Sequence, residues 1–225
     1  MRGGGWLLVA ALVASAFACR ERDEPAAPAP SAAPSAGSVA SPTASASASA
    51  PAPLAPRRAD AAQGGAIARA GDKLYVVDDA NKTLRTVSLP IDADLHAAPS
   101  VALPGRPGQV AVLGGRVFVT VRDPGLLMVF EPEADEGLVE RARVPVPADA
   151  WGLAVAADGA VAIVTSAWTH QVSIVDVAGK RVKSSVDVAR EPRGVVVAAD
   201  GEAAYVSHLV GASLTKVPLD GGAPI

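Results

Sequence analysis

One pattern of apolar and polar positions occurs twice near the C-terminal end of this sequence, between residues 151 and 219. Residues 152–176 read GLAVAADGAVAIVTSAWTHQVSIVD, and residues 194–219 read GVVVAADGEAAYVSHLVGASLTKVPL. Each copy has an apolar run, an Asp-Gly pair, a second apolar run, a polar loop and a third run. Short apolar or alternating runs separated by turn residues predict β-strands joined by hairpins. An Asp-Gly pair favours such a hairpin because both residues can adopt positive φ.

The same pattern extends upstream with a nearly constant period. The second apolar run has an equivalent central position in each of four copies, occupied by Tyr75, Phe118, Ile163 and Tyr205. These residues are 43, 45 and 42 positions apart. A period of about 40 to 45 residues with four short strands is the signature of a β-propeller blade. We therefore predict an all-β domain over residues 63–225, with four-stranded blades near 65–104, 108–147, 152–189 and 194–225.

Particular residues in these repeats match a known repeat family. Residues 153–155 and 195–197 are the apolar first strands, and the Asp-Gly turns are at 158–159 and 200–201. Residues 205–208 read Tyr-Val-Ser-His where the family has Tyr-Val-Thr-Asn, and residues 172–176 correspond to its third strand. The array thus resembles the YVTN-type β-propeller repeat of secreted and surface proteins. That resemblance implies a fold and leaves the function open.

The number of predicted strands does not complete a ring, because the fourth repeat has room for only three. The chain can be part of a longer propeller, or a small four-bladed ring in which a segment near residues 60–63 supplies the missing outer strand. Alternatively, two copies can pair into a full ring. Unpaired strand edges promote association, so we also expect self-association through open blade edges.

The N-terminal residues have the features of an export signal. Arg2 precedes a largely apolar stretch at residues 6–17, and residues 16–18 read Ala-Phe-Ala before Cys19, the only cysteine. This arrangement resembles a bacterial lipoprotein signal, with residues 1–18 removed and Cys19 lipidated; an ordinary secretory cut that leaves Cys19 as a free thiol is the alternative. The resemblance implies attachment to the membrane through an N-terminal lipid in the cell envelope, at the outer membrane, on its periplasmic or surface side.

A linker is predicted between Cys19 and the repeats, over residues 19–62. Residues 25–56 consist only of Pro, Ala, Ser, Gly, Thr, Val and Leu. Such a segment has few large side chains to bury against the entropy of ordering, so we expect it to be disordered.

Composition excludes several functions. The formal net charge is −3, whereas nucleic-acid binding requires a basic surface, so we expect no nucleic-acid partner. A single cysteine excludes an intrachain disulfide and a Cys-x-x-Cys-His haem site. The histidines do not fall at equivalent repeat positions, so we predict neither metal nor cofactor. The sequence contains no recognisable set of catalytic residues; we therefore lean towards a non-enzymatic protein.

Blade connectivity predicts which loops share a face of the array. Loops between blades, and loops between second and third strands, lie opposite the Asp-Gly hairpins. Seven residues are candidates for a binding surface on that face: Arg106, Arg122, Trp151, Trp168, His170, Arg193 and His208. Trp168 and His170 can instead be packing residues, and His208 can hydrogen-bond a loop. Arg106 and Arg193 can bind a carboxylate or phosphate, or pair with neighbouring Asp or Glu.

Two functions follow from these observations. The first is an envelope-anchored lipoprotein that binds or scaffolds a protein or small ligand on one propeller face. The second is what the resemblance to YVTN-type repeats implies through residues 205–209, Tyr-Val-Ser-His-Leu: the propeller portion of a larger secreted redox enzyme resembling di-haem cytochrome c peroxidases, with the catalytic domain absent from this chain.

Overall fold

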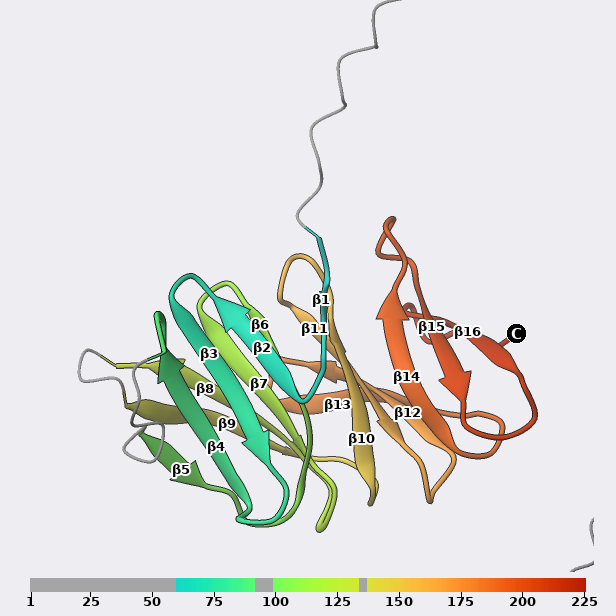
Figure 1. Cartoon of the computed structure of the whole chain (residues 1–225). Helices are drawn as coiled ribbons and strands as arrows, with labels where there is room; N and C mark the ends of the chain where they lie inside the picture. The colour runs from blue at the N-terminus through green and yellow to red at the C-terminus, as the bar shows by residue number, and fades with distance from the viewer. Residues whose placement is uncertain (1–59, 92–98, 134–136) are drawn as a thin grey trace, which may run out of the picture. The chain divides into compact units, whose positions relative to one another are not determined.

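The computed structural model describes residues 60–91, 99–133 and 137–225 (Figure 1). Contacts divide the chain into residues 1–51 and 52–225, and all described residues belong to the second unit. The predicted signal peptide, Cys19 and the linker up to residue 59 lie outside the described residues. Within the described part of the chain, no helix has the length and hydropathy needed to cross a membrane.

The described residues form 16 β-strands in four antiparallel sheets, which we call blades 1 to 4. Blade 1 contains β2 (Ile67–Ala70), β3 (Lys73–Asp78), β4 (Thr83–Ser88) and β5 (Ser100–Ala102). Blade 2 contains β6 (Pro107–Leu113), β7 (Arg116–Val121), β8 (Leu126–Pro132) and β9 (Leu138–Pro145). Blade 3 contains β10 (Ala150–Val155), β11 (Val161–Ser166), β12 (Gln171–Asp176) and β13 (Arg181–Asp187). Blade 4 contains β14 (Pro192–Val197), β15 (Ala203–His208) and β16 (Leu214–Pro218).

This arrangement confirms the predicted all-β class and the four repeats. Each blade is a meander in which neighbours in sequence pair in the sheet (Figure 1). The fourth blade has three strands, as predicted. Beyond β16, the backbone N–H and C=O of Ile225 exchange hydrogen bonds with Lys216, at 2.9 and 2.8 Å. Among the described residues, no strand pairing or core cluster joins blade 4 to blade 1.

Three hydrophobic clusters lie between successive blades. Alternate residues of each strand point to opposite faces of a sheet, so one strand contributes to two clusters. In β7, Val117 and Val119 pack towards blade 1, whereas Phe118 packs towards blade 3. The predicted central residues of the second strands therefore belong to the face that each blade presents to its successor. Tyr75, Phe118 and Ile163 are all buried there.

The Asp-Gly hairpins form where the sequence places them, but with a different turn. In blade 3, Gly159 N–H donates to the carbonyl of Ala156 at 2.8 Å, and only Gly159 of the pair has positive φ, at 69°. Asp158 instead accepts a hydrogen bond from the backbone N–H of Ala160 through its carboxylate. The hairpin is thus a four-residue turn closed by glycine, which is another common type.

The segment before blade 1 forms a strand whose position differs from the one predicted from the sequence. β1 (Ala62–Gln63) pairs antiparallel with β10, the innermost strand of blade 3, with Ala62 opposite Val155. The expectation that residues near 60–63 supply a missing outer strand is therefore wrong. Glycine permits the close approach: a Cβ on Gly64 would lie 2.9 Å from the carbonyl oxygen of Leu153.

Candidate functional site

Three of the predicted face residues meet where blades 2, 3 and 4 adjoin. Trp151 lies at the start of β10, Arg122 directly follows β7, and Arg193 lies in β14. The guanidinium carbons of Arg122 and Arg193 lie 4.3 and 4.4 Å from the centre of the Trp151 rings. Each contact has the geometry of a cation–π interaction. We call Arg122, Trp151, Arg193, Asp149 and Glu191 the arginine–tryptophan cluster.

Buried and half-buried carboxylates neutralise this cluster. Arg122 Nε donates to Asp149 Oδ1 at 2.7 Å, and the Asp149 side chain has no exposed surface. Arg193 Nη2 donates to Glu191 Oε2 at 3.0 Å, while Arg193 Nη1 lies 3.7 Å from Asp149 Oδ2. Two guanidinium groups therefore face two carboxylates. The cluster joins successive blades, and its charges are already balanced without a bound anion.

The neighbouring pair of blades contains an equivalent ion pair with the charges exchanged. Arg106 Nε donates to Asp79 Oδ1 at 2.9 Å. In this pair, as in Arg122–Asp149, the two partners are 27 residues apart in the sequence. Both partners of this pair are about half exposed. The hydrogen bonds from Arg106 lower the pKa of the Asp79 carboxyl, and they raise the pKa of Arg106 in return. Arg106 thus pairs with a nearby carboxylate, one of the two predicted alternatives.

The remaining three predicted residues do not gather into one site. His208 is buried: its Nδ1 lies 3.0 Å from the Arg190 carbonyl oxygen and its Nε2 2.8 Å from Thr215 Oγ1. His208 therefore makes a hydrogen bond to a loop, which was the alternative to a place in a binding surface. Trp168 and His170 lie in the turn between β11 and β12, where Trp168 is 64% exposed. In the described ranges, no group of three or more His, Cys, Asp or Glu side chains is placed to hold a metal ion.

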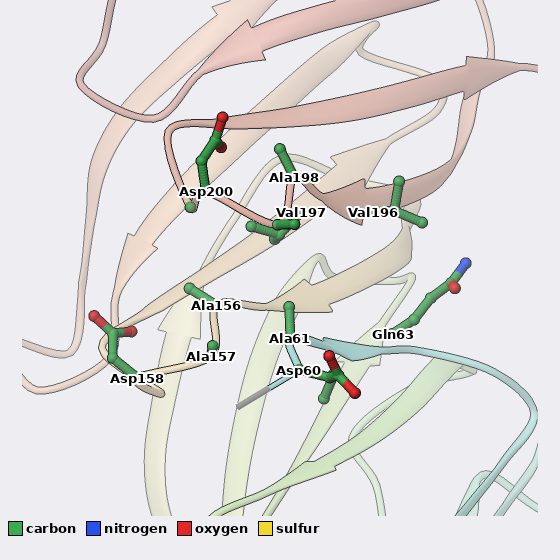
Figure 2. Close-up of a pocket in the computed structure, with 13 residues that line it drawn as sticks. Asp60, Ala61, Gln63, Ala156, Ala157, Asp158, Val196, Val197, Ala198 and Asp200 are labelled. Atoms are coloured by element: carbon green, nitrogen blue, oxygen red, sulfur yellow. The ribbon is translucent and has the colours of Figure 1, made fainter. Parts of the chain in front are cut away.

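An open cleft lies on the side of the Asp-Gly hairpins, between β1 and β14. It encloses about 690 Å³ and is lined by residues 60–63, 156–158 and 196–201. Figure 2 shows small side chains on both sides of the cleft, Ala61 and Ala156 on one side and Ala198 on the other, with three aspartates around them. These aspartates are Asp60, Asp158 and Asp200. Sequence reasoning missed the cleft, although the repeated Asp-Gly turns place two of its carboxylates on one side.

The cleft is bounded by the inner edge of blade 4. β10 of blade 3 has neighbours on both sides, β11 and β1, whereas β14 pairs only with β15 in the described structure. An edge strand presents backbone N–H and C=O groups that can pair with another extended chain. No ion pair among the described residues involves Asp60 or Asp158. Here the chain thus offers a backbone edge and negative charge together.

Known structures share this arrangement of blades. Hydrazine synthase of Kuenenia stuttgartiensis superposes with a TM-score of 0.59 and 16% identity, covering 71% of this chain and 47% of that chain. A putative 6-phosphogluconolactonase from Bacteroides fragilis superposes with a TM-score of 0.58 and 15% identity, covering 69% and 50%. The fold is propeller-like. At such identities the likeness concerns the fold alone, and the chain spans about half the length of each structure.

Comparison of the sequence with known families adds no closer relative. No family model and no curated protein matches the chain. The resemblance to YVTN-type repeats and to a lipoprotein signal therefore stays a prediction from the residues.

Proposed function

We propose that this protein is a binding module of the bacterial cell envelope, attached through a lipid at Cys19, that takes its ligand in the cleft between β1 and β14. The cleft itself is the observation that carries this proposal. Its volume of about 690 Å³ lies within the roughly 300 to 1,000 Å³ range of ligand pockets. In the arginine–tryptophan cluster, by contrast, the guanidinium groups already contact Trp151 and carboxylates of neighbouring blades.

The walls of the cleft suit an extended ligand with positive charge. β1 is already an extended segment added to the inner edge of blade 3, so strand addition is compatible with this fold. The edge of β14 occupies the corresponding place in blade 4. Backbone pairing to a strand edge supplies affinity, and side-chain contacts supply selectivity. Asp60 and Asp158 select a ligand with cationic side chains.

A labelled model peptide tests this function. A fluorescein-labelled peptide of alternating alanine and lysine is titrated with the protein at low ionic strength, and fluorescence anisotropy is measured. Asp60→Asn and Asp158→Asn are each expected to weaken binding about 3-fold to 5-fold, because an exposed ion pair contributes up to about 1 kcal/mol. Asparagine retains the oxygen that accepts the Ala160 N–H in the turn.

The chain offers a matched control for the turn. Asp220 Oδ1 accepts the N–H of Gly222 at 2.9 Å, as Asp158 Oδ1 accepts that of Ala160, but Asp220 is not part of the cleft. Asp220→Asn should leave the affinity unchanged. Equal weakening by Asp220→Asn, or equal binding of an alanine–glutamate peptide, would reject the cleft as the site.

A further inference from the structure

The exposed face of blade 4 has the same kind of residues as the faces that are buried between blades inside the array. In each of the last three blades, a hydroxyl residue of the second strand lies opposite an apolar residue of the third strand: Thr120 and Leu127, Thr165 and Val172, Ser207 and Leu214. The pairs in blades 2 and 3 have no exposed surface, because the next blade covers them. Leu214 is 65% exposed, and Ser207 is also exposed.

The hydroxyl group links one blade to the next. Thr120 Oγ1 accepts the N–H of Gln109 in its own blade and donates to the Trp151 carbonyl of blade 3 at 2.8 Å. Thr165 Oγ1 does the same one blade later, accepting from Gly152 and donating to the Arg193 carbonyl at 3.0 Å. The same two hydrogen bonds therefore occur at the junction of blades 2 and 3 and at the junction of blades 3 and 4.

Ser207 occupies the third position of this series. It pairs with Gly194 in the sheet, and a Cβ on that glycine would lie 2.6 Å from Ser207 Oγ. The corresponding contacts at Gly108 and Gly152 are 2.7 and 2.6 Å, to Thr120 and Thr165. The exposed face of blade 4 therefore has the same construction as the faces on which blades 3 and 4 pack.

Blade 1 carries the complementary half of such a junction. Leu153 of blade 3 belongs to the same core cluster as Ala111 of blade 2, and Val195 of blade 4 belongs to the same cluster as Ala154 of blade 3. In blade 1, Ala68 and Ala70 pack towards blade 2. Strand alternation turns Ile67 to the opposite face, where it is 55% exposed. Ile67 corresponds to Leu153 and Val195, and Val196 of blade 4 corresponds to Ala111 and Ala154.

We propose that the exposed face of blade 4 binds blade 1 of a second copy of this chain. The chain carries both halves of one blade junction, and each half is exposed. Two copies joined head to tail have eight blades, within the roughly four to eight blades of known propellers. A head-to-tail contact forms a discrete ring when its rotation closes. The assembly is therefore a closed dimer with two equal junctions, Ile67 of one copy against Val196 of the other.

Cysteine cross-linking tests the junction. The full chain carries Cys19→Ser, which removes its own thiol, together with Ile67→Cys and Val196→Cys. Mild oxidation is expected to give only a dimer on non-reducing electrophoresis. Either cysteine alone should give no cross-linked product, because each residue faces the other and not itself.

Sedimentation equilibrium supplies a second measurement. The full chain is expected to be a dimer, and Leu214→Asp should raise its dissociation constant at least about 100-fold, because an unpaired carboxylate would be desolvated in the junction. Trp168→Asp, at an equally exposed residue outside the junction, should leave the constant unchanged.

Three results would overturn this assembly. They are a chain that stays monomeric at about 100 μM, a double-cysteine variant that forms a ladder of larger products, and one that forms no disulfide. Val196 also lines the cleft, so ligand binding is tested through residues outside the junction: Asp60→Asn and Asp158→Asn should weaken peptide binding without changing the mass.

Discussion

Replacement of Asp149 tests whether the arginine–tryptophan cluster holds blades 2, 3 and 4 together. The carboxylate is fully buried, whereas Arg122 and Arg193 keep 20% and 24% of their side-chain surface. Removing one partner of a buried ion pair costs about 3 to 5 kcal/mol, and the partial exposure of the arginines favours the lower value. Asp149 also has φ of 57°, where asparagine is tolerated and alanine costs roughly 1 kcal/mol more. We expect about 3 kcal/mol for Asp149→Asn and about 4 kcal/mol for Asp149→Ala.

The contacts of Asp149 explain why the asparagine variant is not conservative. Its Oδ2 and Arg193 Nη1 are both buried, 3.7 Å apart, and neither has a hydrogen-bond partner among the described residues, so their attraction is between charges. An amide cannot supply that attraction.

The assay is urea unfolding followed by circular dichroism, with Asp79→Asn as the matched control. Asp79 and Arg106 form the equivalent pair between blades 1 and 2, but they are 47% and 57% exposed. An exposed pair contributes at most about 1 kcal/mol and often nothing measurable. The transition midpoint should therefore fall clearly for Asp149→Asn and hardly at all for Asp79→Asn. Equal shifts for the two variants would refute the conclusion that burial decides the strength of these pairs.

Three further predictions concern the blade junctions and the anchor. Thr165→Val should lower the free energy of unfolding in urea by about 2 to 4 kcal/mol, because Gly152 N–H and the Arg193 carbonyl lose their shared partner. Ser207→Ala, compared in the monomer, should change that free energy little; similar losses for the two variants would contradict this. Gly152→Ala should reduce soluble yield sharply, since its Cβ would lie 2.0 Å from the Arg193 carbonyl oxygen; normal yield and an unchanged melting curve would show that the junction can adjust. Cys19→Ser should abolish incorporation of radiolabelled palmitate in a bacterial host; unchanged labelling would exclude lipidation at this residue.

The repeat period allowed the strands to be located from the sequence. The central residues of the second strands, such as Phe118 and Ile163, recur at the blade period because each packs on the next blade. The meeting of Arg122, Trp151 and Arg193 also follows from connectivity, which brings the interblade connections and the loops between second and third strands to one face. Their pairing was left open, because a carboxylate such as Asp149 has no periodic signal.

The cleft and β1 could not be predicted in the same way. β1 is two residues long, Ala62–Gln63, and has no period of its own. Its position depends on the backbone hydrogen bond from Gly64 N–H to the Leu153 carbonyl, 2.7 Å long, between residues far apart in sequence. Small residues such as Ala61 carry little pattern, although they are what leaves the cleft open.

The two candidate regions differ in which interactions the fold has already used. On the loop face, the guanidinium groups of Arg122 and Arg193 are committed to Trp151 and to carboxylates, so substitutions there should change stability before they change binding. On the hairpin face, Asp60 lines an open cleft beside the edge of β14, which is unpaired in the described structure. Its charge can be removed without breaking an ion pair to any other described residue. The balanced charges of the loop face therefore hold neighbouring blades together, whereas the charges beside the edge of β14 support the proposal that the cleft binds the ligand.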